Sequence, residues 1–199
     1  HQYKACMALA KKSPEEAFET ALTWRDLGGG DAAEHCVAAA LIGLGQYTDA
    51  ARRMETLAGK AKQNSSVKAG LLAHAAQAWI LANNNSRAEA VLTAAIILTP
   101  WNVDLLIDRA QSRAGQRNYN GAIEDLNKAI ENGSRPADAF VFRAAAYRLL
   151  DKLELALADI ERALAFRPDH PDGLLERGIL RRMRNNDDGA RQDWLNIIR

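Results

Sequence analysis

The stretch FVFRAAAYRLLDKLELALADIERALAFRP, residues 140–168, determines the architecture that the sequence predicts. Its residue Ala156 has counterparts at one constant interval in both directions, and the column is Ala88, Ala122, Ala156 and Ala190. We call this interval the repeat step. A second column keeps the same step, with Ala95, Ala129, Ala163 and Ile197. Columns that stay in register over four units are hard to obtain by chance, so the sequence predicts a repeat architecture.

The composition predicts helix throughout the chain. Its 199 residues include 38 Ala and 24 Leu against only 5 Val, and Ala and Leu favour helices whereas β-branched residues favour strands. We therefore expect an all-α fold. No apolar run approaches the ~18 residues that span a bilayer, so we expect no membrane insertion. The 26 basic and 25 acidic side chains leave a net charge of +1, without the basic excess of a nucleic-acid binder.

The repeat unit resembles the tetratricopeptide repeat (TPR) family, whose pattern is a large residue-x2-Leu-Gly-x2-Tyr, then Ala-x3-Phe, then Pro. The matching residues here are Phe140, Ala144, Tyr147, Ala156, Ile160 and Pro168. The resemblance implies a right-handed α-solenoid of antiparallel helix pairs that forms a single domain over residues 1–199. We expect about six units, the first of them short. Their approximate ranges are 1–30, 31–65, 66–102, 103–136, 137–170 and 171–199.

Charged residues also recur at the repeat step. Arginines stand at 109, 143 and 177, and aspartates follow at one constant spacing, at 125, 159 and 193. This spacing places one partner on each helix of a pair. The unit before them has Ala75 and Val91 at the two places, so charge occurs at both or at neither. We expect the structural ion pairs Arg109–Asp125, Arg143–Asp159 and Arg177–Asp193; a ligand-binding or catalytic role is the alternative.

The two cysteines, Cys6 and Cys36, fall on the first helices of consecutive units. Since such helices stack side by side in the TPR fold, a Cα separation of about 5–6 Å is possible, which a disulfide requires. A free buried pair and a disulfide both stay open, and the disulfide would indicate an oxidising compartment. The stretch from Trp24 to Cys36 resembles exported TPR proteins of alpha-proteobacteria. We therefore expect a processed periplasmic protein, with the cytoplasm as the alternative.

Catalytic and metal-binding patterns are missing from the sequence. Its four histidines, at positions 1, 35, 74 and 170, have no metal-ligand spacing, and each is interpreted as structural or solvated. The phosphate-binding and nucleophile motifs GxGxxG, GxxxxGK[ST] and GxSxG do not occur. The sequence predicts no enzyme, no cofactor and no bound metal.

The first helix of each unit lines the concave face of a TPR solenoid, and this face is the expected binding surface. Helical spacing places five candidate partner-binding residues on it: Gln77, Asp108, Gln111, Arg148 and Arg182. The C-terminal end also carries Arg181 and Arg184, which form either an ion-paired face or a site for an acidic partner.

The sequence thus predicts a non-enzymatic scaffold that binds a protein or peptide on the concave face. The alternative is a structural protein that assembles into homo-oligomers through its C-terminal helix, where Trp194, Ile197 and Ile198 lie.

Overall fold

The computed structural model describes residues 1–61, 64–133 and 137–198. The unit boundary expected at residue 136 and the last residue, 199, lie outside this part. Twelve α-helices occupy most of the described residues, which contain no strand. The all-α fold of helix pairs is therefore confirmed. Within the described ranges, no helix combines the length and the apolar character needed to cross a membrane.

The helices fall into two compact units, His1–Pro100 (unit 1) and Trp101–Arg199 (unit 2). Unit 1 contains α1 (Gln2–Lys12), α2 (Pro14–Trp24), α3 (Gly30–Gly43), α4 (Tyr47–Lys60), α5 (Ser65–Leu81) and α6 (Asn85–Leu98), with a short π-helical turn, η1 (Arg25–Gly29), before α3. Unit 2 contains α7 (Val103–Gly115), α8 (Tyr119–Asn132), α9 (Ala137–Leu149), α10 (Leu153–Phe166), α11 (Pro171–Met183) and α12 (Asp187–Ile197). The single domain over residues 1–199 and its six unit ranges stay predictions.

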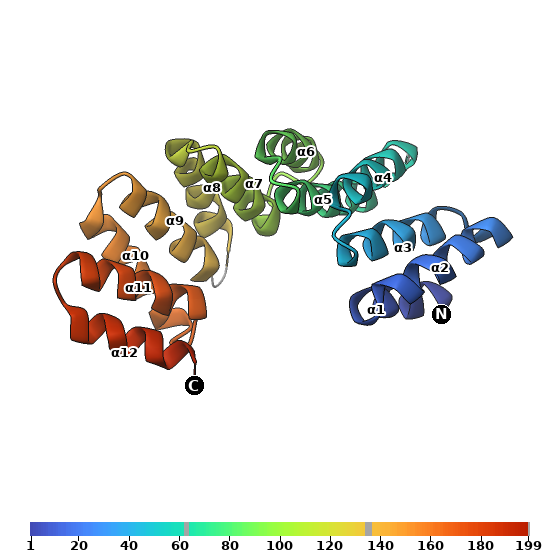
Figure 1. The fold of residues 1–199 in the computed structure, drawn as a ribbon. Helices are drawn as coiled ribbons and strands as arrows, with labels where there is room; N and C mark the ends of the chain where they lie inside the picture. Colours follow the sequence, from blue (N-terminus) through green and yellow to red (C-terminus); the bar gives the residue numbers. More distant parts are fainter. Residues whose placement is uncertain (62–63, 134–136, 199) are drawn as a thin grey trace. The chain divides into compact units, whose positions relative to one another are not determined.

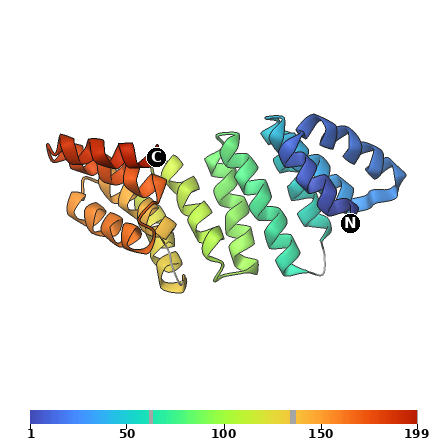
Figure 2. The same ribbon diagram turned by 90° about the horizontal axis from the view of Figure 1, so that it is seen from below.

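Helices that follow one another in the chain pack as antiparallel pairs. The two helices of a pair run side by side in both views of the ribbon (Figure 1, Figure 2). In unit 2 the first helices also contact each other, α7 against α9 and α9 against α11. Side chains that point away from the partner helix can therefore combine into one surface across these three helices.

The turn between the two helices of a pair repeats one backbone geometry. After α7, Arg117 has a φ of 61°, and the N–H of Asn118 donates to the carbonyl of Arg113, which is a Schellman motif. Asn118 then caps α8, because its side chain accepts from the N–H of Gly121. Positive φ recurs at Gly45, Asn83, Asp151 and Asn185. The same few residues thus end one helix and begin the next.

The small-residue columns lie where the two helices of a pair meet. Ala88, Ala122, Ala156 and Ala190 are each at most 1% exposed, and Ala95, Ala129 and Ala163 are fully buried. In unit 2 the larger Phe140, Ile160 and Leu174 pack around them in one apolar cluster. Small side chains let the paired backbones approach, and the larger ones fill the space between successive turns.

The last pair differs from the others at a further column of small residues. Residues 76, 110 and 144 are Ala, but residue 178 is Gly, and Trp194 stands where residues 92, 126 and 160 are Leu or Ile. A Cβ on Gly178 would lie 2.2 Å from the indole Nε1 of Trp194. The large indole therefore occupies the space that a methyl group takes in the other pairs.

We expect Gly178→Ala to destabilise the chain by about 1–3 kcal/mol, because the added methyl group overpacks against the Trp194 indole. In a Trp194→Leu background the same change meets no indole. There it should stabilise the chain by about 0.5–1 kcal/mol, the usual advantage of Ala over Gly inside a helix. Urea unfolding of the parent, the two single variants and the double variant measures both effects. An equal effect of Gly178→Ala in the two backgrounds would contradict this packing.

Candidate partner-binding surface

The repeating arginines and aspartates meet between the two helices of each pair in unit 2. The structure forms the pairs Arg109–Asp125, Arg143–Asp159 and Arg177–Asp193, with closest N···O distances of 2.7, 2.7 and 2.6 Å. In each pair the Nε and Nη2 groups donate to the two carboxylate oxygens. Such bidentate contacts are the strongest form of Arg–carboxylate bonding. The three aspartates are at most 2% exposed.

Further donors saturate the same carboxylates. Arg113 approaches Asp125, and Arg181 donates to Asp193 at 2.8 Å. The middle guanidinium, Arg143, also donates to Asn127, and its hydrogen bonds to Asp159 raise its pKa above the ordinary value. Because each carboxylate bonds to arginines of its own helix pair, the geometry supports the structural interpretation over a catalytic one.

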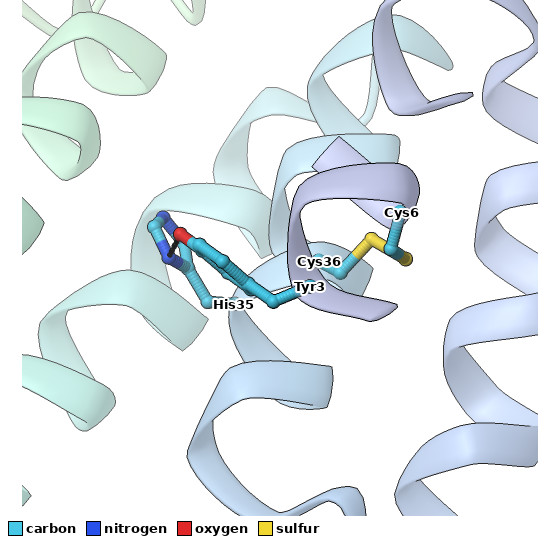
Figure 3. The surroundings of a disulfide bond; sticks show 4 residues. All are labelled: Tyr3, Cys6, His35 and Cys36. Carbon is cyan, nitrogen blue, oxygen red and sulfur yellow. Dashed lines mark hydrogen bonds between the residues drawn. A yellow bond between two sulfur atoms is a disulfide. The ribbon is translucent and has the colours of Figure 1, made fainter. Parts of the chain in front are cut away.

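Cys6 of α1 and Cys36 of α3 form a disulfide (Figure 3), with their Cα atoms 6.1 Å apart. Of the two alternatives that the sequence leaves open, the structure contains the bonded one. Both residues are buried. In the chain-entropy model, a disulfide that joins residues 30 positions apart raises the free energy of unfolding by roughly 3–4 kcal/mol. The bond fixes α1 against α3.

Four of the five predicted partner-binding residues lie on the first helices of unit 2. Asp108 and Gln111 are half-buried on α7, Arg148 is half-buried on α9, and Arg182 is exposed on α11. Gln77 is exposed on α5 of unit 1.

The basic cluster at the C-terminal end is largely neutralised. Arg148 pairs with the buried Glu176, Arg181 with Asp193, and Arg184 with Glu154. Among the described residues, Arg182 has no ion-pair partner. Of the two interpretations of this cluster, the structure therefore favours the ion-paired face.

A hollow of about 200 Å³ opens between α7, α8 and α9 of unit 2. We call it the unit 2 hollow, and its lining is Ala110, Gln111, Ala114, Ala122, Leu126, Phe142, Ala145, Ala146 and Leu149. Of the predicted residues, Gln111 lies in this lining, where it is the polar member. Phe142 and Ala145 follow Asp108 and Gln111 by one repeat step, so the repeat register places them on the same face of the first helix. Their position makes the first-helix surface apolar at this point.

A row of three polar side chains crosses the first helices of unit 1. Tyr3 Oη of α1 lies 2.8 Å from Nδ1 of His35 on α3 (Figure 3), and His35 Nε2 lies 3.2 Å from Nδ1 of His74 on α5. Burial, and then the neighbouring charge of His74, lower the pKa of His35 to about 4. Burial also lowers the pKa of His74 and raises that of Tyr3. At neutral pH this histidine row is uncharged.

Sequence reasoning treated each histidine separately and missed this row. The interval from His35 to His74 is longer than the repeat step, which separates Ala88 from Ala122. The greater length of α5, with 17 residues against 13 in each of α7, α9 and α11, hides the fact that both histidines occupy similar places on their helices. The interval from Ala50 to Ala88 exceeds the repeat step in the same way, and this is the signal that reveals the row.

The C-terminal helix buries part of its apolar face inside its own unit. Ile197 packs against the apolar cluster of unit 2, and Trp194 is half-buried. Leu195 and Ile198 are 42% and 79% exposed. Self-association through this helix stays a prediction.

No family model matches the sequence, and no curated protein matches it significantly. Several solved structures do match. A tetratricopeptide repeat protein from Parabacteroides merdae ATCC 43184 superposes with a TM-score of 0.74 at 18% identity, covering 96% of this chain and 75% of that one. The C-terminal part of a TPR repeat-containing protein from Cytophaga hutchinsonii gives 0.71 at 18% identity, covering 98% and 78%. YrrB, described as a TPR protein with an unusual peptide-binding site, gives 0.66 at 18% identity, covering 85% and 86%.

The chain has the tetratricopeptide repeat fold. At this level of identity the likeness establishes the fold alone, and an alpha-proteobacterial origin stays a prediction. Seven of the nine residues that line the unit 2 hollow belong to the first helices α7 and α9, and the sequence predicts that first helices bind the partner.

The buried ion pairs of the TPR units should be energetically coupled. We expect Asp159→Ala to cost about 3–5 kcal/mol, because it leaves the Arg143 guanidinium with little exposure and without its partner. The double variant Arg143→Leu/Asp159→Ala should cost clearly less than the sum of the single variants. Urea unfolding of all four proteins gives the coupling energy. Additive single effects would reject the pairing.

Proposed function

We propose that the chain is a non-enzymatic interaction scaffold that binds an extended segment of a partner protein along α7, α9 and α11 of unit 2. The unit 2 hollow is the observation that carries this proposal, because it is an apolar depression on the first-helix side of a TPR fold. The fold adds support, since YrrB, with the same fold, is described as having a peptide-binding site.

The size of the hollow indicates the kind of ligand. Pockets for small molecules have volumes of about 300–1,000 Å³, and the unit 2 hollow, at about 200 Å³, is smaller. It suits one apolar side chain of a peptide. Five of its nine lining residues are Ala, so the anchor side chain can approach the helix backbones closely.

The charges around the hollow argue against an acidic ligand. The guanidinium of Arg148 is held by Glu176, which leaves Arg182 as an exposed positive charge on the same row of first helices. Gln111 can bond to a peptide backbone through its amide, which donates and accepts. We therefore propose recognition by an apolar anchor and backbone hydrogen bonds, and not by a run of acidic residues.

Selection of a phage-displayed library of short random peptides against the purified chain tests this proposal. We expect peptides that share one large apolar residue. Their affinity, measured by fluorescence polarisation, should fall at least tenfold in Ala145→Arg, because the new side chain fills and charges the hollow. Ala158→Arg, on the exposed side of α10, is the matched control and should bind like the parent. The proposal would be refuted if no peptide were selected, or if Ala145→Arg and Ala158→Arg lost the same peptide affinity.

We also propose that the protein works in an oxidising compartment, the periplasm. The Cys6–Cys36 disulfide supports this location, because such bonds persist outside the reducing cytosol. Thiol titration in denaturant, after rapid alkylation in the source cells, should find no free thiol without reductant and two with it. Two free thiols without reductant would favour the cytoplasm.

A further inference from the structure

A second hollow, on unit 1, brings together four side chains with soft or borderline metal-binding atoms. It has a volume of about 330 Å³, and its lining includes Met7, His35, Met54 and His74. These four residues come from α1, α3, α4 and α5 in that order. The rest of the lining is Ala10, Lys11, Ala39, Ile42 and Gly43. We call it the His–Met hollow.

The two imidazoles already have the spacing of ligands to one ion. Their facing nitrogens, His35 Nε2 and His74 Nδ1, are 3.2 Å apart. Two nitrogens bound to one tetrahedral ion at about 2.0–2.1 Å lie roughly 3.3 Å from each other. An ion could therefore replace the contact between the rings with little movement of α3 or α5.

The surroundings of His35 suit a metal ligand. Tyr3 Oη, 2.8 Å from Nδ1, can accept a hydrogen bond from the Nδ1–H group of His35, and in this tautomer the lone pair on Nε2 faces His74. In that arrangement His74 Nδ1 is the donor in the ion-free protein. Binding of an ion moves this proton to Nε2 of the same ring, so no net proton is released.

The donor set selects the kind of ion. Thioether sulfur favours Cu⁺, and imidazole also suits copper, whereas Zn²⁺ sites usually take three or four ligands from Cys, His, Asp and Glu. Within the described residues, no group of three or more such side chains could hold a metal ion. Lys11 adds a positive charge to the lining, and the nine lining residues include no carboxylate. This charge favours an ion of single charge over a divalent ion.

We propose that His35 and His74, together with the thioethers of Met7 and Met54, bind one Cu⁺ ion in the His–Met hollow of unit 1. The disulfide supports the site because it holds α1, which carries Tyr3 and Met7, against α3, which carries His35 (Figure 3). No electron transfer is involved, and the ion enters and leaves in the same oxidation state.

Competition with bicinchoninate, in ascorbate to keep copper as Cu⁺, tests the proposal on the full chain with its disulfide intact. We expect one Cu⁺ per chain. Affinity should fall at least tenfold in His35→Gln and in His74→Gln, and at least threefold in Met7→Leu and in Met54→Leu. Leucine keeps the volume of methionine without the sulfur, so these variants should remain folded, which circular dichroism melts verify.

The chain supplies matched controls for both ligand types. Its third methionine, Met183, lies exposed on α11, and His1 lies exposed before α1. Met183→Leu and His1→Gln should leave Cu⁺ affinity unchanged. Absence of Cu⁺ binding, or binding that survives in folded His74→Gln, would overturn the proposal. The proposal would also be overturned if Zn²⁺ bound as tightly as Cu⁺ and if Met7→Leu and Met54→Leu had the same metal affinity as Met183→Leu.

Discussion

The close approach of the two helices in each pair limits what every other part of the structure can do. Two backbones can come this near only where both helices present small side chains, and the buried alanines at the repeat step provide them. Where one helix has no side chain at all, at Gly178, the partner helix fills the space with Trp194. A larger side chain on one helix is thus accommodated by a smaller one on the facing helix.

The same close contact determines where charge is allowed. A carboxylate between two packed helices is cut off from water, and burial of a lone charge is costly. Asp125, Asp159 and Asp193 are buried there because a guanidinium from the facing helix reaches both oxygens of each. These pairs place six charged side chains of unit 2 between its own helices. The near-balance of basic and acidic residues in the chain is thus partly a packing property.

Most of the fold could be predicted from the sequence because periodic positions share one environment. The alanine columns and the spacing of Arg143 and Asp159 needed only the repeat register. The turn residues were harder to predict from the sequence, because they share a backbone conformation and not a side-chain type. These residues are Gly45, Asn83, Arg117, Asp151 and Asn185. The histidine row could not be read from the repeat step alone, since the extra length of α5 moves His74 out of register with His35. Charge pairing across helices, such as Arg148 with Glu176, depends on side-chain reach that sequence spacing does not give.

Function in such a chain has to come from the positions that break the repeat. A residue repeated in every unit is explained by packing that every unit shares, so it cannot distinguish one part of the surface from another. Asp108 and Gln111 on α7 become Phe142 and Ala145 on α9, and this change from polar to apolar creates the unit 2 hollow. Likewise, Met7, His35, Met54 and His74 gather in unit 1, where α5 is longer than the first helices of unit 2. The two units share one packing scheme, but each has a first-helix surface of its own, and binding properties should be assigned to each unit separately.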